Sequence, residues 1–267
     1  MAHIEEYFRG EKLYGDDFSI EQIKEWYEQE AEAYAQLYGI NDNESEYNHH
    51  INIMYGYNHL KKIKSFDNVL GFGSSWGYEF MPIISKIQNL QIIDSSEQTV
   101  AKKIGSCTPT YHKANTSGKI DILDNTFDLI TAFSTIHHTP NVSFILNELF
   151  RVLKPGGYIL LKEPVTTMGD WRTKRDGLTV NERGIPPLIL DKIIKDANMQ
   201  IIKKKYFCTM TAFFMRISRN HSFFQSKTYF LIDKYLSCLL KFNMHYHPTK
   251  KRQRIAPQAV FYILRKK

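Results

Sequence analysis

Cysteine is scarce in this chain, and its pattern limits the possible chemistry. Cys107, Cys208 and Cys238 are odd in number, lie far apart and include no CxxC pair. Disulfide frameworks and cysteine-ligated zinc sites use paired cysteines at short spacings. The pattern therefore fits three reduced thiols better than a disulfide-stapled or zinc-binding domain.

Long apolar runs are absent as well. No stretch approaches the roughly 18 uninterrupted apolar residues of a membrane-spanning helix. The opening segment, MAHIEEYFRGEKLYGDD, is acidic and lacks the apolar run of a signal peptide. We therefore expect a cytoplasmic protein without stable membrane insertion.

Acidic residues are almost missing from the last part of the chain. Residues 200–267 carry 15 basic side chains and the single acid Asp233, a net of +14, within a total of +7. Residues 1–50 show the reverse, with 13 acidic and 3 basic side chains and a net of −10. The two ends can pack against each other, or this polarity can serve a pocket for an anionic substrate.

The remaining composition is that of an ordinary globular protein. With 267 residues, 43% of them hydrophobic, the chain can bury a substantial core and lies near the upper size limit of one domain. We expect one integrated domain, made of an N-terminal helical cap (1–64), a cofactor-binding core (65–165), and a lid with a C-terminal substrate cap that completes the sheet (166–267).

The middle of the chain alternates short apolar runs with helical stretches, which is typical of a parallel sheet covered on both faces. The expected strands are 68–72, 90–93, 108–112, 127–132 and 158–162, and the expected helices are 78–87, 97–104 and 143–153. Lys154-Pro-Gly-Gly predicts a turn before the last of these strands.

Both flanks also contain expected elements. Before the core, 19–38 has an apolar stripe with Ser19 as a helix cap, and 50–64 predicts a second helix. After the core we expect a polar loop at 166–184, helices at 187–197 and 227–242, and a closing strand at 259–267.

A loop of small residues, Gly71-Phe-Gly-Ser-Ser-Trp-Gly77, follows the first strand. Such a loop lets the backbone approach a cofactor at a helix N-terminus, although phosphate binding or tight packing would use it equally well. Asp94 ends the second strand about 20 residues later, where a carboxylate can accept hydrogen bonds from a ribose. Alternatively, Asp94 caps a helix that begins near Ser96.

The order of these motifs resembles class I S-adenosylmethionine-dependent methyltransferases, especially the small-molecule group that includes quinone-methylating enzymes. Three stretches carry the resemblance: VLGFGSSWG, LDNTFDLITAFSTIHH and ILNELFRVLKPGGYILLKEP. The resemblance covers residues 67–164. It implies an α/β, Rossmann-like sheet with helices on both faces, S-adenosylmethionine as cofactor and S-adenosylhomocysteine as product.

The resemblance also implies the cofactor contacts, with two departures from the family pattern. The acid usual at the end of the first strand is Gly71 here, and the middle glycine is Ser75. Glu79 is the candidate replacement for the missing carboxylate, or else an exposed helix residue. The implied contacts are Gly71, Gly73, Ser74, Ser75, Gly77, Glu79, Asp94, Ser95, Thr116, Ser117 and Ser134.

Candidate catalytic residues follow two later strands, at the edge where such sheets bind ligands. His137 and His138 follow the fourth strand, and either can serve as a general base or pack over the cofactor. Glu163 ends the fifth strand and can orient or deprotonate an acceptor. Methyl transfer otherwise needs mainly alignment in a dry site.

Charged residues of the lid and of the C-terminus are the candidates for binding an anionic acceptor. They are Asp170, Arg172, Arg175, Arg252 and Arg254, and the alternative for all of them is a solvated surface. His245 and His247 lack a nearby carboxylate or cysteine that would complete a metal site, so we predict no metal.

The leading hypothesis is O-methylation of a small polar, anionic metabolite, such as a sugar, a phosphate or phosphoramidate, or a nucleotide-linked precursor. The loop and lid segments are similar to methyltransferases of bacterial capsule and surface-glycan pathways. The oligomeric state is not predicted.

Three alternatives stand beside it. C-methylation of a quinone or lipid is suggested by the aromatics Phe213, Phe214, Phe223, Phe224, Tyr229 and Phe230. Nucleic-acid methylation is disfavoured, because STIHH replaces the NPPY-type segment of base-methylating enzymes. A non-catalytic cofactor-binding module is the third.

Overall fold

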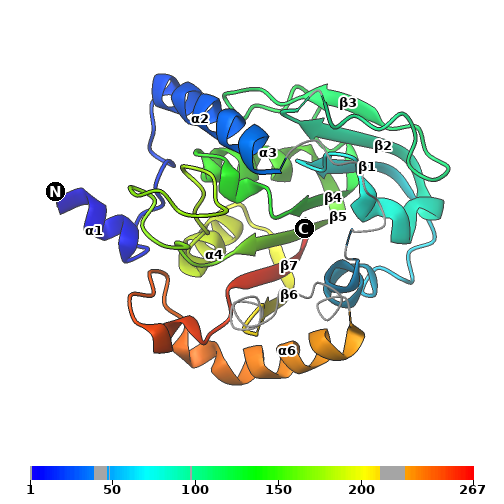
Figure 1. Cartoon of the computed structure of the whole chain (residues 1–267). Helices are drawn as coiled ribbons and strands as arrows, with labels where there is room; N and C mark the ends of the chain where they lie inside the picture. Colours follow the sequence, from blue (N-terminus) through cyan, green and yellow to red (C-terminus); the bar gives the residue numbers. More distant parts are fainter. Residues whose placement is uncertain (1, 39–46, 48, 97, 211–225) are drawn as a thin grey trace.

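The computed structural model describes residues 2–38, 47, 49–96, 98–210 and 226–267. Its centre is a seven-stranded sheet in the order β3-β2-β1-β4-β5-β7-β6, in which β7 is antiparallel to its neighbours (Figure 1). The strands are β1 (Phe66–Phe72), β2 (Ile87–Asp94), β3 (Thr110–Lys113), β4 (Phe127–Phe133), β5 (Leu153–Pro164), β6 (Gln200–Phe207) and β7 (Ala259–Arg265). This confirms the Rossmann-like α/β fold expected from the sequence.

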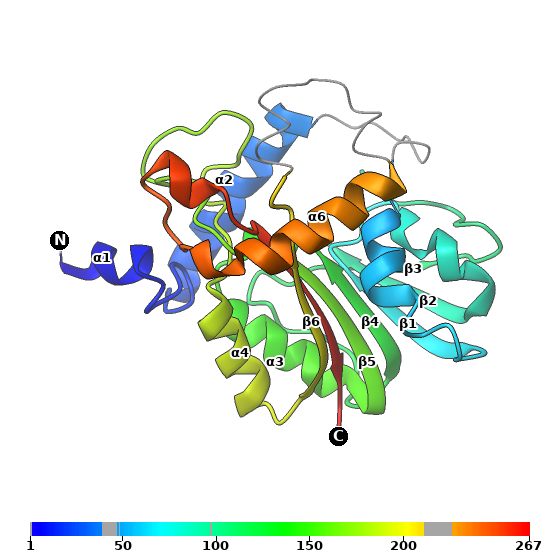
Figure 2. The same cartoon turned by 90° about the horizontal axis from the view of Figure 1, so that it is seen from below.

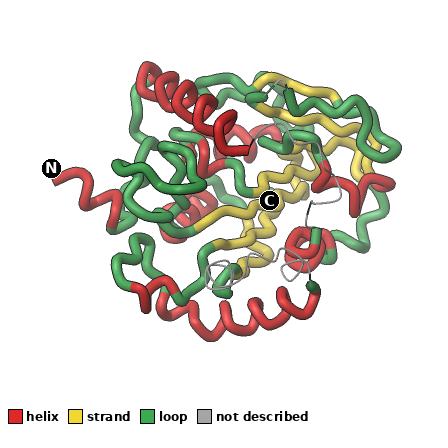
Figure 3. The backbone as a smooth tube through the Cα atoms, in the orientation of Figure 1, coloured by secondary structure: helices red, strands yellow, loops and turns green. Residues whose placement is uncertain are grey.

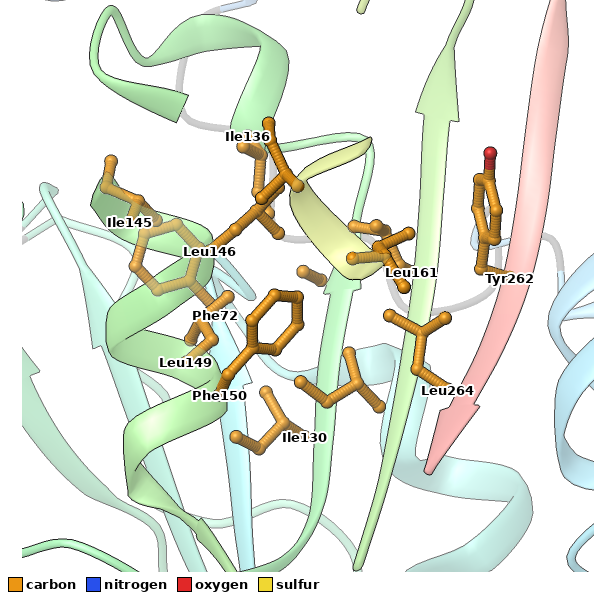
Figure 4. Packing of buried hydrophobic residues seen from close by; sticks show 14 of the residues in the cluster. Phe72, Ile130, Ile136, Ile145, Leu146, Leu149, Phe150, Leu161, Tyr262 and Leu264 are labelled. Carbon is orange, nitrogen blue, oxygen red and sulfur yellow. The ribbon is translucent and has the colours of Figure 1, made fainter. Parts of the chain in front are cut away.

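Helices and turns cover both faces of the sheet. One apolar cluster joins the sheet to α3 (Val142–Val152) and α4 (Pro187–Asp196), with Ile145, Leu146 and Leu149 fully buried (Figure 4). A second cluster, on the other face, joins the sheet to a π-helical turn (Asn52–Tyr57) and a 3-10 helix (Tyr78–Lys86). The core is therefore continuous through both faces of the strands.

Most expected elements form, with shifted ends. The five core strands and the closing strand are present, and α2 (Ile20–Tyr38), α3, α4 and α6 (Lys227–Leu240) match the expected helices. Their ends differ because pairing, rather than propensity, fixes them. The Lys154-Pro-Gly-Gly turn, for example, is part of β5, and Gly156 N–H donates to the Lys266 carbonyl.

Three expectations about helices are wrong. The segment 98–104 is not helical: Ala101 N–H donates to the Tyr111 hydroxyl and Ile104 pairs with Cys107, so its polar groups bond elsewhere. The expected helix 50–64 shrinks to the π-helical turn at Asn52–Tyr57. The stretch after Gly77 is a 3-10 helix with Pro82 inside it, and not a regular α-helix.

Two elements were not expected. β6 has the sequence QIIKKKYF, with three consecutive lysines and no alternation, so its pairing with β7 at the sheet edge defines it. α1 (Ala2–Phe8) is short and is stabilised by packing, because Phe8 stacks on His247 and contacts Trp171.

The N-terminal helices lie beside the loop that joins β5 to α4, while α6 runs along the opposite side of the molecule against β6 (Figures 1 and 2). We call residues 166–184 of this loop the lid; Figure 3 shows it as loop, without helix or strand. Asp16 accepts hydrogen bonds from the Ser143 backbone and hydroxyl at the start of α3. The N-terminal segment is thus fastened to both core and lid.

Two further features concern the cysteines and the length of the helices. Cys107, Cys208 and Cys238 form no disulfide with one another. Among the described residues, every helix is too short or too polar to pass through a lipid bilayer.

Candidate functional site

The glycine-rich loop after β1 is a tight turn at the carboxyl edge of the sheet. Gly73 and Gly77 have φ values of 62° and 69°, in the left-handed region that favours glycine. A Cβ on Gly73 would lie 2.7 Å from Thr135 Cβ, and one on Gly77 would lie 2.3 Å from Ile104 Cδ1. Both glycines are therefore required by the fold itself, besides any ligand.

Ser75 takes the place of the middle glycine without changing this turn. Its φ is 47°, so it adopts the left-handed conformation at some energetic cost. Its backbone N–H donates to Asp94 Oδ2 at 2.8 Å, and its carbonyl accepts from the Tyr111 hydroxyl. These contacts hold a non-glycine residue in the loop conformation.

Asp94 links the loop to the end of β2. Its second oxygen, Oδ1, accepts from the Ser96 backbone N–H at 2.9 Å. The described residues that follow, 98–104, form no helix, so helix capping does not explain this carboxylate. Each oxygen keeps a further lone pair, and the side chain is only half-buried. Asp94 can therefore accept hydrogen bonds from a ribose beside the loop.

Glu79 stands behind the loop, in the region that a β1 carboxylate would otherwise fill. A Cβ at Gly71 would lie 2.3 Å from Ser74 Oγ and 2.9 Å from Phe80, so that position is closed to a side chain. Glu79 is only 4% exposed, and its Oε1 accepts from Ser74 Oγ at 2.6 Å and from Thr131 Oγ1 at 3.1 Å. The reading of Glu79 as an exposed helix residue is wrong.

The environment of Glu79 disfavours its negative charge. Burial raises the pKa of Glu79 to about 7, while hydrogen bonds from Ser74 and Thr131 and the charge of Lys162 act in the opposite direction. Burial also lowers the pKa of Lys162, which lies over the Phe133 ring. A cationic ligand group near the loop would favour the ionised form of Glu79.

The other implied cofactor residues lie along the same edge. Ser95 and Thr116 are exposed, and Ser134, with φ of 59°, directly follows β4. Ser117 is bonded to Asn115 Oδ1 through its N–H and hydroxyl, and its carbonyl accepts from Asn141. The loop 115–117 is thereby fixed, next to a hollow of about 380 Å³ lined in part by Ile93, Lys113 and Asn115.

His137, just after β4, and Glu163, near the end of β5, form a buried pair. Glu163 is fully buried and accepts backbone N–H groups of Thr135, Ile136 and His137, as well as His137 Nδ1 at 2.8 Å. His137 Nε2 lies 3.5 Å from Glu182 Oε1. The two carboxylates raise the pKa of His137 to about 9 against the opposing effect of burial. An imidazolium of this kind cannot accept a proton, and Glu163 serves to position the turn.

His138 faces a carboxylate that the sequence analysis did not identify. Its Nδ1 lies 3.0 Å from Glu30 Oε2, and Glu30 Oε1 accepts the Asn181 N–H of the lid. Trp26 Nε1 donates to the His138 carbonyl at 2.7 Å. Glu30 is separated from its partners by more than a hundred residues, so no local sequence signal could have revealed it.

The charged lid residues that were expected to bind substrate make contacts with other residues of the protein instead. Arg175 donates to the carbonyls of Thr167, Thr179, Val180 and Glu182. Arg172 pairs with Asp170 and, although exposed, lies over the Phe8 ring. Neither side chain is arranged to bind an anion, so the structure does not support their expected role.

Arg183 is the basic lid residue that is fully buried, and it holds the lid to the core. Its guanidinium donates to the carbonyls of Tyr14, His137, Thr139 and Pro140, and it lies over the Trp26 ring. The sequence analysis did not single it out, because a basic residue in a polar loop gives no sign of burial.

Arg252 and Arg254 occupy an exposed 3-10 turn, Lys251–Arg254, shortly before β7. Within the described part of the chain, neither guanidinium makes an ion pair. His247 Nδ1 bonds to the Thr167 hydroxyl, and His245 Nδ1 to the Asn243 carbonyl. Because β7 starts beside the end of β5, this turn leads into the carboxyl edge of the sheet.

Comparisons with known proteins agree with this geometry. Residues 70–161 match a family of methyltransferase domains. An uncharacterized methyltransferase of Schizosaccharomyces pombe is 28% identical over 120 residues, which are 39% of this chain and 42% of the relative. The match thus spans about two fifths of the length of that relative.

Solved structures share the fold. The YcgJ protein of Bacillus subtilis has a TM-score of 0.54 at 16% identity and covers 83% of this chain and 100% of its own. A SAM-dependent methyltransferase of Archaeoglobus fulgidus has a TM-score of 0.52 at 16% identity, with 79% and 90% covered. S-adenosylmethionine is the cofactor that goes with such a domain. Residues 70–161 of this chain therefore match an S-adenosylmethionine-dependent methyltransferase domain.

Proposed function

We propose that the whole chain is a methyltransferase that binds S-adenosylmethionine at the Gly71–Gly77 loop and methylates a small polar acceptor under the lid. The observation that carries this proposal is the pair of carboxylates on either side of the loop. Asp94 is held by two backbone N–H groups, and Glu79 lies buried behind Ser74. Two carboxylates in these positions suit the ribose and the ammonium group of one cofactor.

The residues present fit the cofactor. Gly73 and Gly77, with positive φ angles, form the tight turn that brings the loop backbone to the carboxyl edge, where a ligand can approach it. Asp94 offers acceptors for two hydroxyl groups, and Glu79 offers negative charge for an ammonium. The bound cofactor supplies an electrophilic methyl group on a sulfonium. The exposed Ser95, Thr116 and Ser134 and the part-buried Ser117 remain proposed contacts along this edge.

The acceptor would enter between the loop, the His137–His138 turn and the lid. Methyl transfer depends on alignment and exclusion of water, which the lid provides by covering the edge. We propose that the acceptor hydroxyl approaches this turn. Glu163 positions the turn, and His138 is the better candidate for contact, because it is part-exposed while His137 lies buried between two carboxylates.

We retain the proposal of an anionic acceptor, with O-methylation as the reaction, on a narrower basis. Arg252 and Arg254 are the exposed arginines near the carboxyl edge, and a guanidinium suits phosphate or carboxylate groups. Arg172 and Arg175 no longer contribute. The resemblance to capsule and surface-glycan enzymes supplies candidate acceptors, among them phosphorylated sugars and nucleotide-linked sugars.

The test is turnover. The purified chain is incubated with S-adenosylmethionine and a panel of phosphorylated and nucleotide-linked sugars, and S-adenosylhomocysteine is measured. We expect acceptor-dependent product, lost in Asp94→Ala. Cofactor binding without product for any acceptor would favour a non-catalytic binding module, and absence of cofactor binding would contradict the proposal.

A specific feature of α6 favours a second candidate, methylation of a lipid or quinone. Leu231, Ile232, Tyr235 and Leu239 are 47%, 47%, 69% and 68% exposed, although Tyr229 and Phe230 are buried. Phe213, Phe214, Phe223 and Phe224 lie outside the described residues. Sedimentation with anionic liposomes at low salt tests this candidate, because binding would favour a membrane-associated acceptor and its absence would remove it.

A further inference from the structure

We infer that two histidines and one carboxylate beneath the lid form a site for a divalent transition-metal ion, of which Zn²⁺ is the best match. The residues are His137 and His138, which follow β4, and Glu182 of the lid. One ligand atom from each lies within 4.8 Å of the other two. This site is distinct from the cofactor loop, and its occupancy does not depend on methyl transfer.

The spacing within the cluster suits a coordination sphere better than direct hydrogen bonding. His137 Nε2 and Glu182 Oε1 are 3.5 Å apart, which is long for a hydrogen bond between charged partners. Two ligands bound to a tetrahedral ion at roughly 2.0–2.1 Å lie about 3.4 Å apart. An ion between these two atoms would therefore need little movement of either side chain.

Each of the three residues has an outer partner that aims its ligand atom. Glu163 Oε2 holds His137 Nδ1 at 2.8 Å, which leaves Nε2 directed at Glu182. Glu182 Oε2 accepts the Thr179 N–H at 3.1 Å, which leaves Oε1 directed at His137. Glu30 approaches His138 Nδ1 at 3.0 Å. Carboxylates that hold metal-binding histidines through the other ring nitrogen are a regular feature of metal sites.

The charges of the cluster also call for a cation. Glu30, Glu163 and Glu182 are 7%, 0% and 6% exposed, and no lysine or arginine of the described residues forms an ion pair with them. Arg175 and Arg183 donate their hydrogen bonds to backbone carbonyls, so their charges act on these carboxylates only through space. The only cations in direct contact with these three buried carboxylates, among the described residues, are therefore the two histidines, if these are protonated.

Protonating both histidines would supply that charge only at a cost. The two imidazole rings lie with centroids 4.1 Å apart, so two imidazolium charges would repel each other in a buried site. A divalent ion provides the same total charge with both rings neutral. Two imidazoles and a carboxylate are borderline ligands, which select Zn²⁺ or Fe²⁺ over Mg²⁺ and Ca²⁺.

A bound ion would connect two parts of the molecule. His137 and His138 belong to the core, Glu182 to the lid, and the outer partner Glu30 to α2. Metal would then fasten the lid over the carboxyl edge, and chelation would loosen it. The sequence analysis, which predicted no metal, considered only His245 and His247, because Glu182 is far from the histidines in sequence.

The test is metal uptake by the untagged full chain, stripped with a chelator and titrated with Co²⁺ as a spectroscopic probe. We expect about one Co²⁺ per chain with the intense visible bands of a low-symmetry site, displaced by Zn²⁺ but not by excess Mg²⁺. His138→Asn and Glu182→Gln should each weaken uptake at least tenfold. His245→Gln, at an exposed histidine outside the cluster, should bind like the unaltered chain.

If a variant misfolds, metal uptake by the unaltered chain still tests the inference. Stripped, folded chain that takes up no Co²⁺ or Zn²⁺ would overturn the inference, as would equal uptake by a folded His138→Asn, Glu182→Gln double variant. S-adenosylmethionine binding is measured in the same samples. Because that binding needs only the loop, its failure would count against the proposed function and not against the metal site.

Discussion

The cofactor edge and the lid edge of this sheet are built in different ways. At the cofactor edge, Asp94 bonds to a loop 19 residues away and Glu79 to Ser74 five residues away. At the lid edge, Glu30 meets His138 and Asn181 across 108 and 151 positions, and Arg183 reaches Tyr14 across 169. Local contacts leave a sequence signature, whereas contacts between distant segments do not.

Substitution of Arg183 should cause the largest loss of stability. Such a loss would show that the lid edge depends on contacts between distant segments of the chain. Arg183→Met leaves buried carbonyls of Tyr14, His137 and Thr139 without donors, so we expect a loss of about 3 kcal/mol or more in the free energy of unfolding. Denaturant unfolding measures it. Arg172→Met, at an exposed arginine, should change the free energy of unfolding by less than about 1 kcal/mol. Equal losses of stability in the two variants would contradict the special role of Arg183.

At the cofactor edge, Asp94→Ala should weaken cofactor binding and leave the stability of the fold nearly unchanged. We expect S-adenosylmethionine binding to weaken by about 1–3 kcal/mol, because charged hydrogen bonds to the ribose are lost. Titration calorimetry measures this, and Asp67→Ala, at an exposed acid near the start of β1, is the control. Unchanged affinity in a folded Asp94→Ala variant would refute the assignment of Asp94 as the residue that binds the ribose.

Glu79 should make cofactor affinity depend on pH. Its pKa is raised to about 7, so the carboxylate is mostly protonated at lower pH and must lose a proton to pair with an ammonium. Affinity should therefore rise from about pH 6 to about pH 8 and then level off. Glu79→Gln should bind more weakly at about pH 8 and show a flat profile over this range. A flat profile in the unaltered chain would remove the ammonium role.

Substitution of Arg252 and Arg254 should have the smallest effect, and it should act on acceptor binding. Replacing both by alanine should raise KM for an anionic acceptor by a few-fold, with kcat and cofactor affinity nearly unchanged, because exposed charges contribute little. Steady-state kinetics at two salt concentrations measures this. An unchanged kcat/KM would mean that these arginines are only a solvated surface.

The sequence predicted the fold and the cofactor edge because their signals are periodic or closely spaced. Strands β1 and β4 are mostly apolar, Gly73 and Gly77 follow β1 closely, and Asp94 ends β2. Glu79 was identified for the same reason, two residues past the loop. Three helix expectations failed, and the segment 98–104 shows why: Ala101 bonds to the Tyr111 hydroxyl and Ile104 pairs with Cys107, so tertiary contacts override helix propensity.

The lid edge could not be predicted in this way. Arg172, Arg175 and Arg183 look alike in sequence, yet one is exposed, one bonds lid carbonyls and one is buried. Gly73 also shows a limit of motif reasoning. Gly73→Val would clash with Thr135 in the fold itself, so loss of binding in that variant would not identify a cofactor loop. Asp94 and Glu79 are the cleaner positions to test.

The central claim is that S-adenosylmethionine binds between Asp94 and Glu79. Calorimetric titration of the full chain with S-adenosylmethionine, beside the Asp94→Ala, Glu79→Gln double variant, tests it most directly. The account predicts one site per chain, with affinity lost in the double variant while circular dichroism shows its fold intact. Equal binding by the two proteins, or none by the unaltered chain, would contradict the account.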